Sequence, residues 1–214
     1  PESFSEGPYD LGMATRLIAG GRYDYVHVDY GRANEAAPAA GNRTPNDIYA
    51  QFYGVTASSE TEHNLGGLFR LEHDYSSSTM VYAGLSRSVR TADTTERGLA
   101  NFMTAMGQPA GSNSWVGNPD IDPEKHHQLD IGFDVQKPAW AFGSSVYANV
   151  VEDYILRDSA RSQPGVLVNF PNADIYRNVD AFLTGFEVHG QWQFAPDWSV
   201  QADATYTFGE DIDA

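Results

Sequence analysis

The sequence of 214 residues contains no cysteine and only 13 lysine and arginine residues. Without cysteine, the chain can form neither a disulfide framework nor a thiolate metal site, and it has no cysteine nucleophile. The 29 aspartate and glutamate residues bring the formal net charge to −16 at pH 7. A chain this acidic, in which lysine and arginine do not cluster, is repelled by phosphate backbones, so nucleic acid is excluded as a partner.

Long apolar runs, helical patterns and catalytic motifs are scarce as well. No apolar run approaches the roughly 20 residues of a transmembrane helix. Stretches of about 12 residues with apolar side chains at helical spacing are always interrupted by glycine, proline or clusters of β-branched residues. The sequence has no G-x-S-x-G elbow, HExxH motif, phosphate-binding glycine loop or dinucleotide fingerprint. These absences argue against an enzyme.

Alternation of apolar and polar residues is abundant instead. In residues 199–208, valine, alanine, tyrosine and phenylalanine alternate with glutamine, aspartate and threonine, and residues 125–136 show the same period of two. Side chains on a strand point alternately to its two faces, so each such segment predicts a strand with one apolar and one polar face. Arg87 is an exception, because it falls on an otherwise apolar face. The pattern predicts about seven strands, at residues 14–30, 60–75, 79–92, 125–136, 140–157, 173–194 and 198–210.

The predicted connections alternate between short and long. Tight turns join strands at residues 76–78, 137–139 and 195–197, whereas residues 31–59, 93–124 and 158–172 form long polar loops. In an up-and-down meander, all short turns then lie at one end and all long loops at the other, and aromatic residues occur near both ends. This arrangement is typical of an all-β, antiparallel transmembrane β-barrel of the outer membrane. Strands of 12 to 22 residues also exceed the usual length in soluble sheets.

Two other readings of the strand pattern stay open. A soluble β-sandwich, or an extracellular all-β binding or adhesion module, could also show alternating strands. Seven strands is an odd number, whereas bacterial barrels close with an even number. We therefore expect residues 1–214 to be one contiguous part of a larger barrel.

Four segments resemble, in order, the barrel of TonB-dependent outer-membrane receptors. They are AGGRYD at 19–24, SRSVRTAD at 86–93, NPDIDPEK at 118–125 with QLDIG at 128–132, and Asn178 with GFE at 185–187. The second segment departs from the family pattern, because Ala92 stands where proline is usual. The resemblance implies about seven strands of a 22-stranded barrel, with an N-terminal plug domain that is absent from residues 1–214. It also implies ligand binding from outside, with TonB as the partner acting through that absent N-terminal region.

Within this family, residues 90–97, 116–119 and the histidine pair at 126–127 look most like the TonB-dependent copper receptors. The resemblance implies transport of copper or a copper complex, with ferric-siderophore transport as the alternative. It places the chain in the outer membrane among lipid and lipopolysaccharide, with long loops extracellular and short turns periplasmic. No tightly bound cofactor is expected, and copper is the expected transported ligand.

Soft ligand atoms gather in the second long loop. Met103 and Met106 precede His126, and thioether sulfur selects Cu(I) while imidazole binds copper in either oxidation state. A helical turn would bring the two sulfur atoms to one side, and only one of the adjacent histidines could join them, because neighbouring strand residues face opposite ways. Methionine also fills irregular gaps in loops. We therefore regard Met103, Met106 and His126 as a candidate metal site with a packing role as the alternative.

Overall fold

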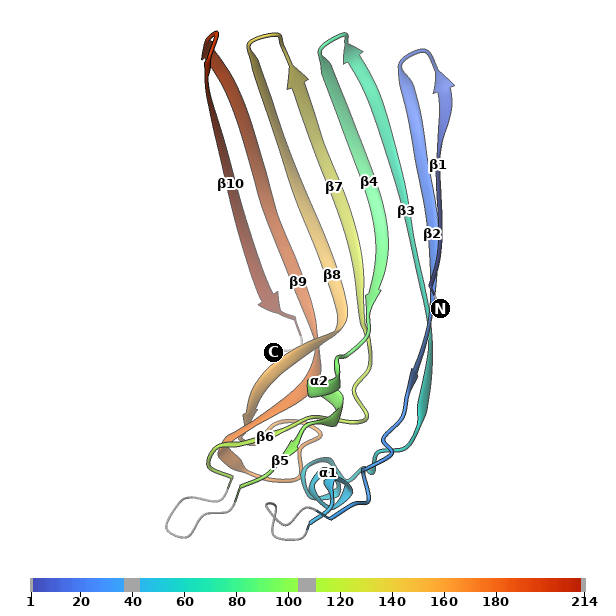
Figure 1. The fold of residues 1–214 in the computed structure, drawn as a ribbon, viewed down its shortest axis with the longest axis vertical. Helices are drawn as coiled ribbons and strands as arrows, with labels where there is room; N and C mark the ends of the chain where they lie inside the picture. The colour runs from blue at the N-terminus through green and yellow to red at the C-terminus, as the bar shows by residue number, and fades with distance from the viewer. Residues whose placement is uncertain (1, 37–42, 104–110, 213–214) are drawn as a thin grey trace.

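The computed structural model describes residues 2–36, 43–103 and 111–212. Long antiparallel strands form a curved wall in these residues, and consecutive long strands lie side by side (Figure 1). The alternating sequence explains this arrangement, because one apolar and one polar face per strand favour a sheet with two different surfaces. The long strands are β1 (Glu2–Gly12), β2 (Thr15–Val28), β3 (Glu60–Ser76), β4 (Thr79–Arg90), β7 (Glu124–Gln136), β8 (Trp140–Ala160), β9 (Phe170–Ala195) and β10 (Trp198–Asp211).

The predicted all-β up-and-down fold is confirmed, and all seven predicted strands are present. The structure adds β1, which pairs with β2 from Glu2–Asp24 to Gly12–Thr15. The odd strand number inferred from the sequence was therefore wrong. Gly7 and Pro8 interrupt the alternation in β1, and proline is tolerated there because β2 is the only strand paired with β1 among the described residues.

The register places apolar side chains on one surface of the wall, which we call the apolar face. Large exposed hydrophobic side chains from β3, β4, β7 and β8 lie there, including Leu65, Phe69, Leu85, Leu129 and Val150. The opposite surface, the polar face, carries the alternate residues. The aromatic ring of Tyr82 lies over Gly132 on this face, and the ion pair of Asp134 with His189 lies over Gly143.

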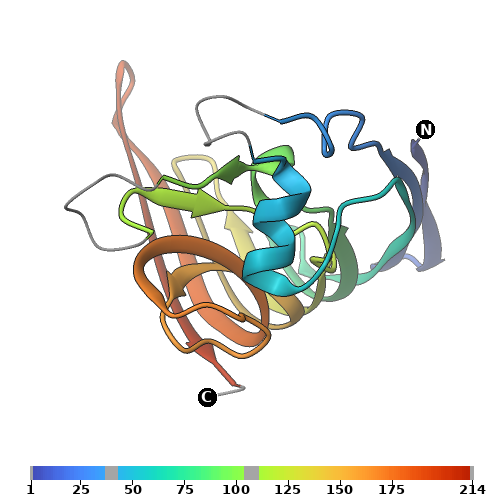
Figure 2. The ribbon, with the colours of Figure 1, turned by 90° about the horizontal axis from the view of Figure 1, so that it is seen from below.

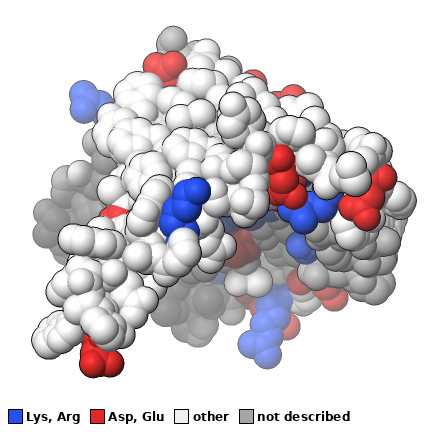
Figure 3. Space-filling view, turned by 90° about the horizontal axis from the view of Figure 1, so that it is seen from above, with Lys and Arg blue, Asp and Glu red and all other residues white. Residues whose placement is uncertain are grey.

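Aromatic side chains mark the end of the wall at which the short turns lie. Trp140, Trp192, Phe194 and Trp198 are exposed there, and the rings of Phe194 and Trp198 are 6.5 Å apart. Seen from this end, the surface consists mainly of uncharged side chains, with charged residues in small groups (Figure 3). An aromatic and uncharged rim is what a membrane interface favours.

The long loops fold into a layer across the other end of the wall (Figure 2). This loop layer contains α1 (Pro45–Tyr53), α2 (Thr94–Gly98), β5 (Ala100–Asn101) and β6 (Ser114–Val116). Strand β6 joins the wall by pairing in parallel with β9 at Ser114–Ala173. Neither helix in the described residues is long and apolar enough to cross a membrane. The sequence predicted these regions only as long polar loops, and the structure adds these short helices and strands to them.

Candidate functional site

Helix α1 organises one half of the loop layer. Its N-terminus is fixed by a capping box, in which the side chain of Thr44 accepts a hydrogen bond from the backbone of Asp47 while Asp47 Oδ2 accepts one from the backbone of Thr44, 2.8 Å away. These hydrogen bonds lower the pKa of Asp47 below its ordinary value. Pro45 occupies the first turn, and Gly54 ends the helix in the left-handed region at φ 77°.

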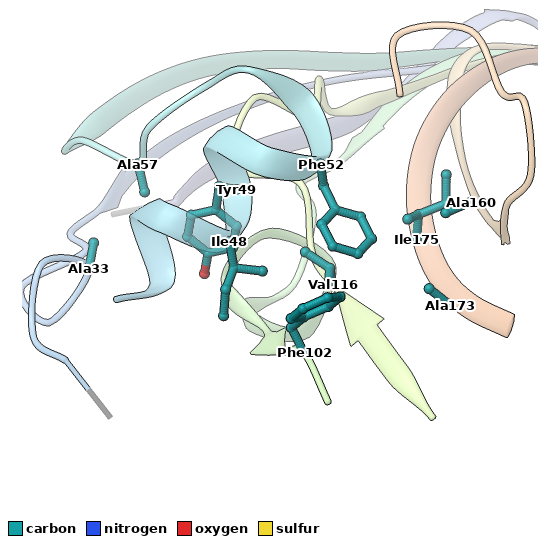
Figure 4. Close-up of a cluster of buried hydrophobic side chains, with 10 residues drawn as sticks. All are labelled: Ala33, Ile48, Tyr49, Phe52, Ala57, Phe102, Val116, Ala160, Ala173 and Ile175. Carbon is teal, nitrogen blue, oxygen red and sulfur yellow. The ribbon is translucent and has the colours of Figure 1, made fainter. Parts of the chain in front are cut away.

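The buried side of α1 forms the core of the loop layer (Figure 4). Phe52 is fully buried and lies edge-on to Phe102 and Phe170, with ring centroids 5.6 and 5.9 Å away. Tyr49 is also buried, and its hydroxyl donates a 2.7 Å hydrogen bond to the carbonyl of Gly98. Burial raises the pKa of Tyr49 to about 12. This core joins three loops that are far apart in the sequence.

Helix α2 carries charged residues that connect the loop layer to the wall. Arg97 is only 2% exposed and forms ion pairs with Glu60, at 2.9 Å, and with Glu62. Glu96, the preceding residue, binds Arg90 at the end of β4, with Arg90 Nη1 3.0 Å from Glu96 Oε2. Arg90 also binds Glu124, the first residue of β7. The short helix is therefore held to β3, β4 and β7 by buried or half-buried charge pairs.

A cavity of about 420 Å³ lies between α1, α2 and the residues that follow β2. Tyr30, Tyr49 and Arg97 form part of its wall. The hydroxyl of Tyr30 and Nε of Arg97 are neighbours, and neither atom has a hydrogen bond of good geometry to a described residue. Burial raises the pKa of Tyr30, so its hydroxyl stays protonated and able to donate at neutral pH. Both polar atoms are themselves buried, so a guest of small-molecule size would reach them only if these side chains moved.

The structure places Met103 and His126, two of the three predicted metal ligands, in different parts of the molecule. Met103 lies next to the aromatic core, is 50% exposed, and its backbone nitrogen donates to Ser114 Oγ at 2.9 Å. Met106 lies outside the described residues. His126 is on the polar face of β7, where its ring bonds Glu124 and Asn149 at 3.1 and 3.0 Å.

The geometry around His126 limits what it can do in the described state. Both ring nitrogens already have hydrogen-bond partners, so metal binding would require one of these bonds to open. In residues 2–36, 43–103 and 111–212, no group of three or more His, Asp or Glu side chains is arranged to hold a metal ion. Neighbouring His127 points to the opposite face and pairs in register with Arg87, as the period of two predicted. The metal site of Met103, Met106 and His126 stays a prediction.

Sequence reasoning missed most of the residues that organise this layer. The charge pairs of Arg90, Glu96 and Glu124, and the buried positions of Tyr49 and Arg97, follow from contacts between segments distant in the sequence. The signals that were available are the two capping boxes, at residues 44–47 and 93–96. Each predicts the start of a short helix.

A long-stranded sheet with one apolar and one polar face, short turns at one end and folded loops at the other defines a section of β-barrel wall. The family model described as "TonB dependent receptor-like, beta-barrel" matches residues 3–214. The chain belongs to this family of TonB-dependent receptors, and the expected membership is confirmed.

Solved structures of the same family share the fold. The chain superimposes on the copper transporter OprC with a TM-score of 0.71 and 24% identity, covering 99% of this chain and 29% of that one. For the FrpB iron transporter from Neisseria meningitidis the TM-score is 0.59 and the identity 13%, with 99% and 25% covered. For the siderophore receptor PirA from Pseudomonas aeruginosa the values are 0.54 and 14%, with 98% and 42% covered. The chain thus spans less than half the length of each of these receptors. No curated protein matches the sequence significantly.

Proposed function

We propose that this chain is part of an outer-membrane receptor that takes up copper or a copper complex with energy from TonB. The observation that carries the proposal is the similarity to the copper transporter OprC, which extends over 99% of this chain and therefore includes the loop layer. The TM-score of 0.71 exceeds those of the two iron and siderophore receptors, at 0.59 and 0.54. Met103 supplies a half-exposed soft ligand next to the core of the loop layer.

In this proposal the long loops face the outside and capture the ligand, while the short turns face the periplasm. The aromatic rim at the turn end and the apolar face support a position of the wall in a lipid bilayer. The chain contributes wall and loops and performs no catalysis. TonB and the plug would act through parts of the receptor other than residues 1–214.

Uptake of a ferric siderophore is the second candidate, and the loop cavity favours it. A chelate has the size to fill part of a cavity of about 420 Å³, which Tyr30 and Arg97 help to line. A bare copper ion would leave such a cavity largely unfilled. An extracellular adhesion module would need neither energy from TonB nor release of its ligand into the periplasm, so uptake measurements exclude or support it directly.

Metal binding to the detergent-extracted, full-length receptor tests the proposal. Cu(I), Cu(II) and a ferric siderophore are titrated in parallel, with bound metal counted by mass spectrometry. The double variant Met103→Ala/Met106→Ala tests the predicted ligands. Met13→Ala/Met80→Ala is the matched control, because it removes the same number of sulfur atoms far from the loop layer.

The possible results separate the candidates. Copper binding that weakens in the first double variant and not in the control supports the copper receptor and places part of its site at residues 103–106. Copper binding that is unchanged in both keeps the copper receptor and makes the Met103 and Met106 prediction wrong. Siderophore binding without copper binding contradicts the copper proposal and supports the second candidate.

A further inference from the structure

The apolar face contains a row of basic side chains near the loop layer. In register across the sheet, Gly67 lies opposite Arg87, Arg87 opposite His127, and His127 opposite Val150. The next row toward the turns contains Phe69, Leu85 and Leu129, followed by Ala148, and is apolar from β3 to β8. Charged side chains on a membrane-facing surface are costly and rare, so Arg87 requires an explanation.

The sheet divides at this row. The pairing of β3 with β4 ends at Gly67–Arg87, beyond which β3 continues along β2 while β4 continues along β7. Figure 1 shows the two strands separating toward the loop layer. The guanidinium of Arg87 donates to the carbonyl of Leu65 across the division. Backbone groups that no longer pair with a neighbouring strand need other polar partners when they face a membrane. The guanidinium of Arg87 is such a partner for the carbonyl of Leu65.

A hollow of about 940 Å³ opens on the apolar face at this division. Its basic lining residues are His63, Arg87, Lys125 and His127, and no aspartate or glutamate of the described residues lines it. The contrast with the whole chain is sharp, because acidic residues outnumber lysine and arginine by 29 to 13. The rest of the lining is largely apolar, with Leu65, Leu129 and Val150 among it.

The basic residues differ in how far their charge is already balanced. Lys125 Nζ lies 2.5 Å from Asp153 Oδ2, and His127 Nε2 lies 3.7 Å from Glu152 Oε1. For Arg87, no ion pair with a carboxylate is found within the described part of the chain. Its guanidinium bonds instead to the neutral carbonyl of Leu65. The positive charge of Arg87 is therefore able to pair with an anion in the hollow.

The height of the hollow fits a lipid headgroup. Arg87 lies eight residues beyond Thr79, where β4 leaves its short turn. At about 3.3 Å per residue and a tilt of about 40°, Arg87 stands roughly 20 Å above the turns. The apolar band of such barrels is about 25 Å high. Arg87 therefore lies in the loop-side part of this band, from which a long arginine side chain reaches toward the headgroups.

We propose that this hollow binds a phosphorylated glycolipid of the outer leaflet, with a phosphate on Arg87 and an acyl chain against Leu129 and Val150. The inference rests on the proposed function in two respects, namely that the apolar face lies in the membrane and that the long loops face outward. The anionic lipid of the outer leaflet in Gram-negative bacteria is lipid A, so lipid A is the committed occupant. Guanidinium and phosphate form strong, bidentate hydrogen bonds, and a phosphate would also cover the division of the sheet.

The test measures lipid binding to the delipidated, detergent-extracted, full-length receptor. Bis-phosphorylated lipid A, dephosphorylated lipid A and phosphatidylglycerol are titrated and detected by native mass spectrometry. Arg87→Gln should weaken binding of phosphorylated lipid A about tenfold, as expected for the loss of one charged hydrogen bond. Arg87→Lys, which keeps the charge, should lose less. Lys137→Gln is the matched control, because Lys137 lies at a short turn and bonds Ser78 there.

Each outcome decides the proposal. It is supported if dephosphorylated lipid A binds weakly, Arg87→Gln binds weakly and Lys137→Gln binds as the wild type does. Equal binding of the two lipid A forms, an unaffected Arg87→Gln variant, or an equal loss in Lys137→Gln overturns it. Tighter or equal binding of phosphatidylglycerol assigns the hollow to phospholipid and overturns the choice of occupant.

Two controls keep the test decisive. If Arg87→Gln fails to fold, as judged by circular dichroism and heat-modified gel mobility, the comparison of the two lipid A forms on the wild type decides. Copper titration of the same samples separates this inference from the proposed function. Failed copper binding with phosphate-dependent lipid binding contradicts only the function.

Discussion

Arg90 donates two hydrogen bonds, each 2.7 Å long, to the carboxylate of Glu124. Glu124 is almost fully buried, and its Oε1 also accepts a bond from the backbone of Ile155. Arg90 at the same time holds Glu96 of α2. One guanidinium thus connects two strands of the wall to the loop layer, and the position of the loops depends on it.

Glu124→Gln should release the loop layer from the wall. The variant removes the negative charge that pairs with the two donors of Arg90. Because Arg90 is 44% exposed and Glu124 is 4% exposed, this loss should cost about 1–3 kcal/mol. Hydrogen exchange of the α2 backbone should accelerate, while the middle of the long strands stays protected. Arg32→Ala is the control, because the Arg32–Glu35 pair is exposed and 3.9 Å long and should contribute less than about 1 kcal/mol. Equal exchange in both variants would contradict the role of Glu124.

Phe52→Ala should destabilise the loop layer more than any exposed substitution nearby. Phe52 is fully buried between Phe102 and Phe170, and removing such a ring costs about 3–5 kcal/mol. Limited proteolysis of the loops should become faster, and ligand binding weaker, without loss of the folded wall. Leu167→Ala in the same layer, where the side chain is exposed, should change little. Unchanged proteolysis in Phe52→Ala would show that this core does not hold the loops.

The strands were predictable because their information is local. An alternation of apolar and polar residues over ten or more positions can be recognised without knowing which strand pairs with which. This alternation located seven of the eight long strands. Strand β1 was missed because Gly7 and Pro8 interrupt that period, and its place depends on pairing with β2. The same alternation showed which residues form the apolar face and which form the polar face. It also showed that Arg87 is a charged residue on the otherwise apolar face.

The candidate site was much less predictable, because it depends on contacts between distant segments. Arg90 and Glu124 are 34 residues apart and meet only through the register of β4 with β7. The buried face of α1 is short, so Ile48, Tyr49 and Phe52 did not form a recognisable helical stripe. The capping boxes were readable, yet a capping box predicts where a helix begins and not what it packs against.

Glycines under the polar face should differ in their tolerance of a methyl group. At Gly132, a Cβ would overlap the ring of Tyr82 and the carbonyl of Ser144, and neither can move freely, because Arg70 stacks on that ring 3.7 Å away. At Gly143, the nearest atoms that a Cβ would meet are the flexible ends of Asp134 and His189. Gly132→Ala should therefore cost about 1–3 kcal/mol, and Gly143→Ala about 1 kcal/mol or less. Thermal unfolding of the extracted receptor measures both, and equal losses would contradict the difference.

The loop layer should lose stability in alkaline solution through Tyr49. Burial raises the pKa of this phenol to about 12, whereas in the unfolded chain it is about 10. The folded layer therefore keeps a proton that the unfolded chain releases, so stability is unaffected below about pH 10 and falls between about pH 10 and 12. Tyr49→Phe should remove this part of the pH dependence, at a constant cost of about 1 kcal/mol for the lost hydrogen bond to Gly98. Tyr9→Phe, at an exposed position near a short turn, should leave the alkaline loss in place. Tyrosinate absorbance and hydrogen exchange of α1, followed together from pH 8 to 12, separate the two variants. A loss as large in Tyr49→Phe as in the wild type would assign it to another buried phenol, such as that of Tyr53, whose pKa is also raised by burial.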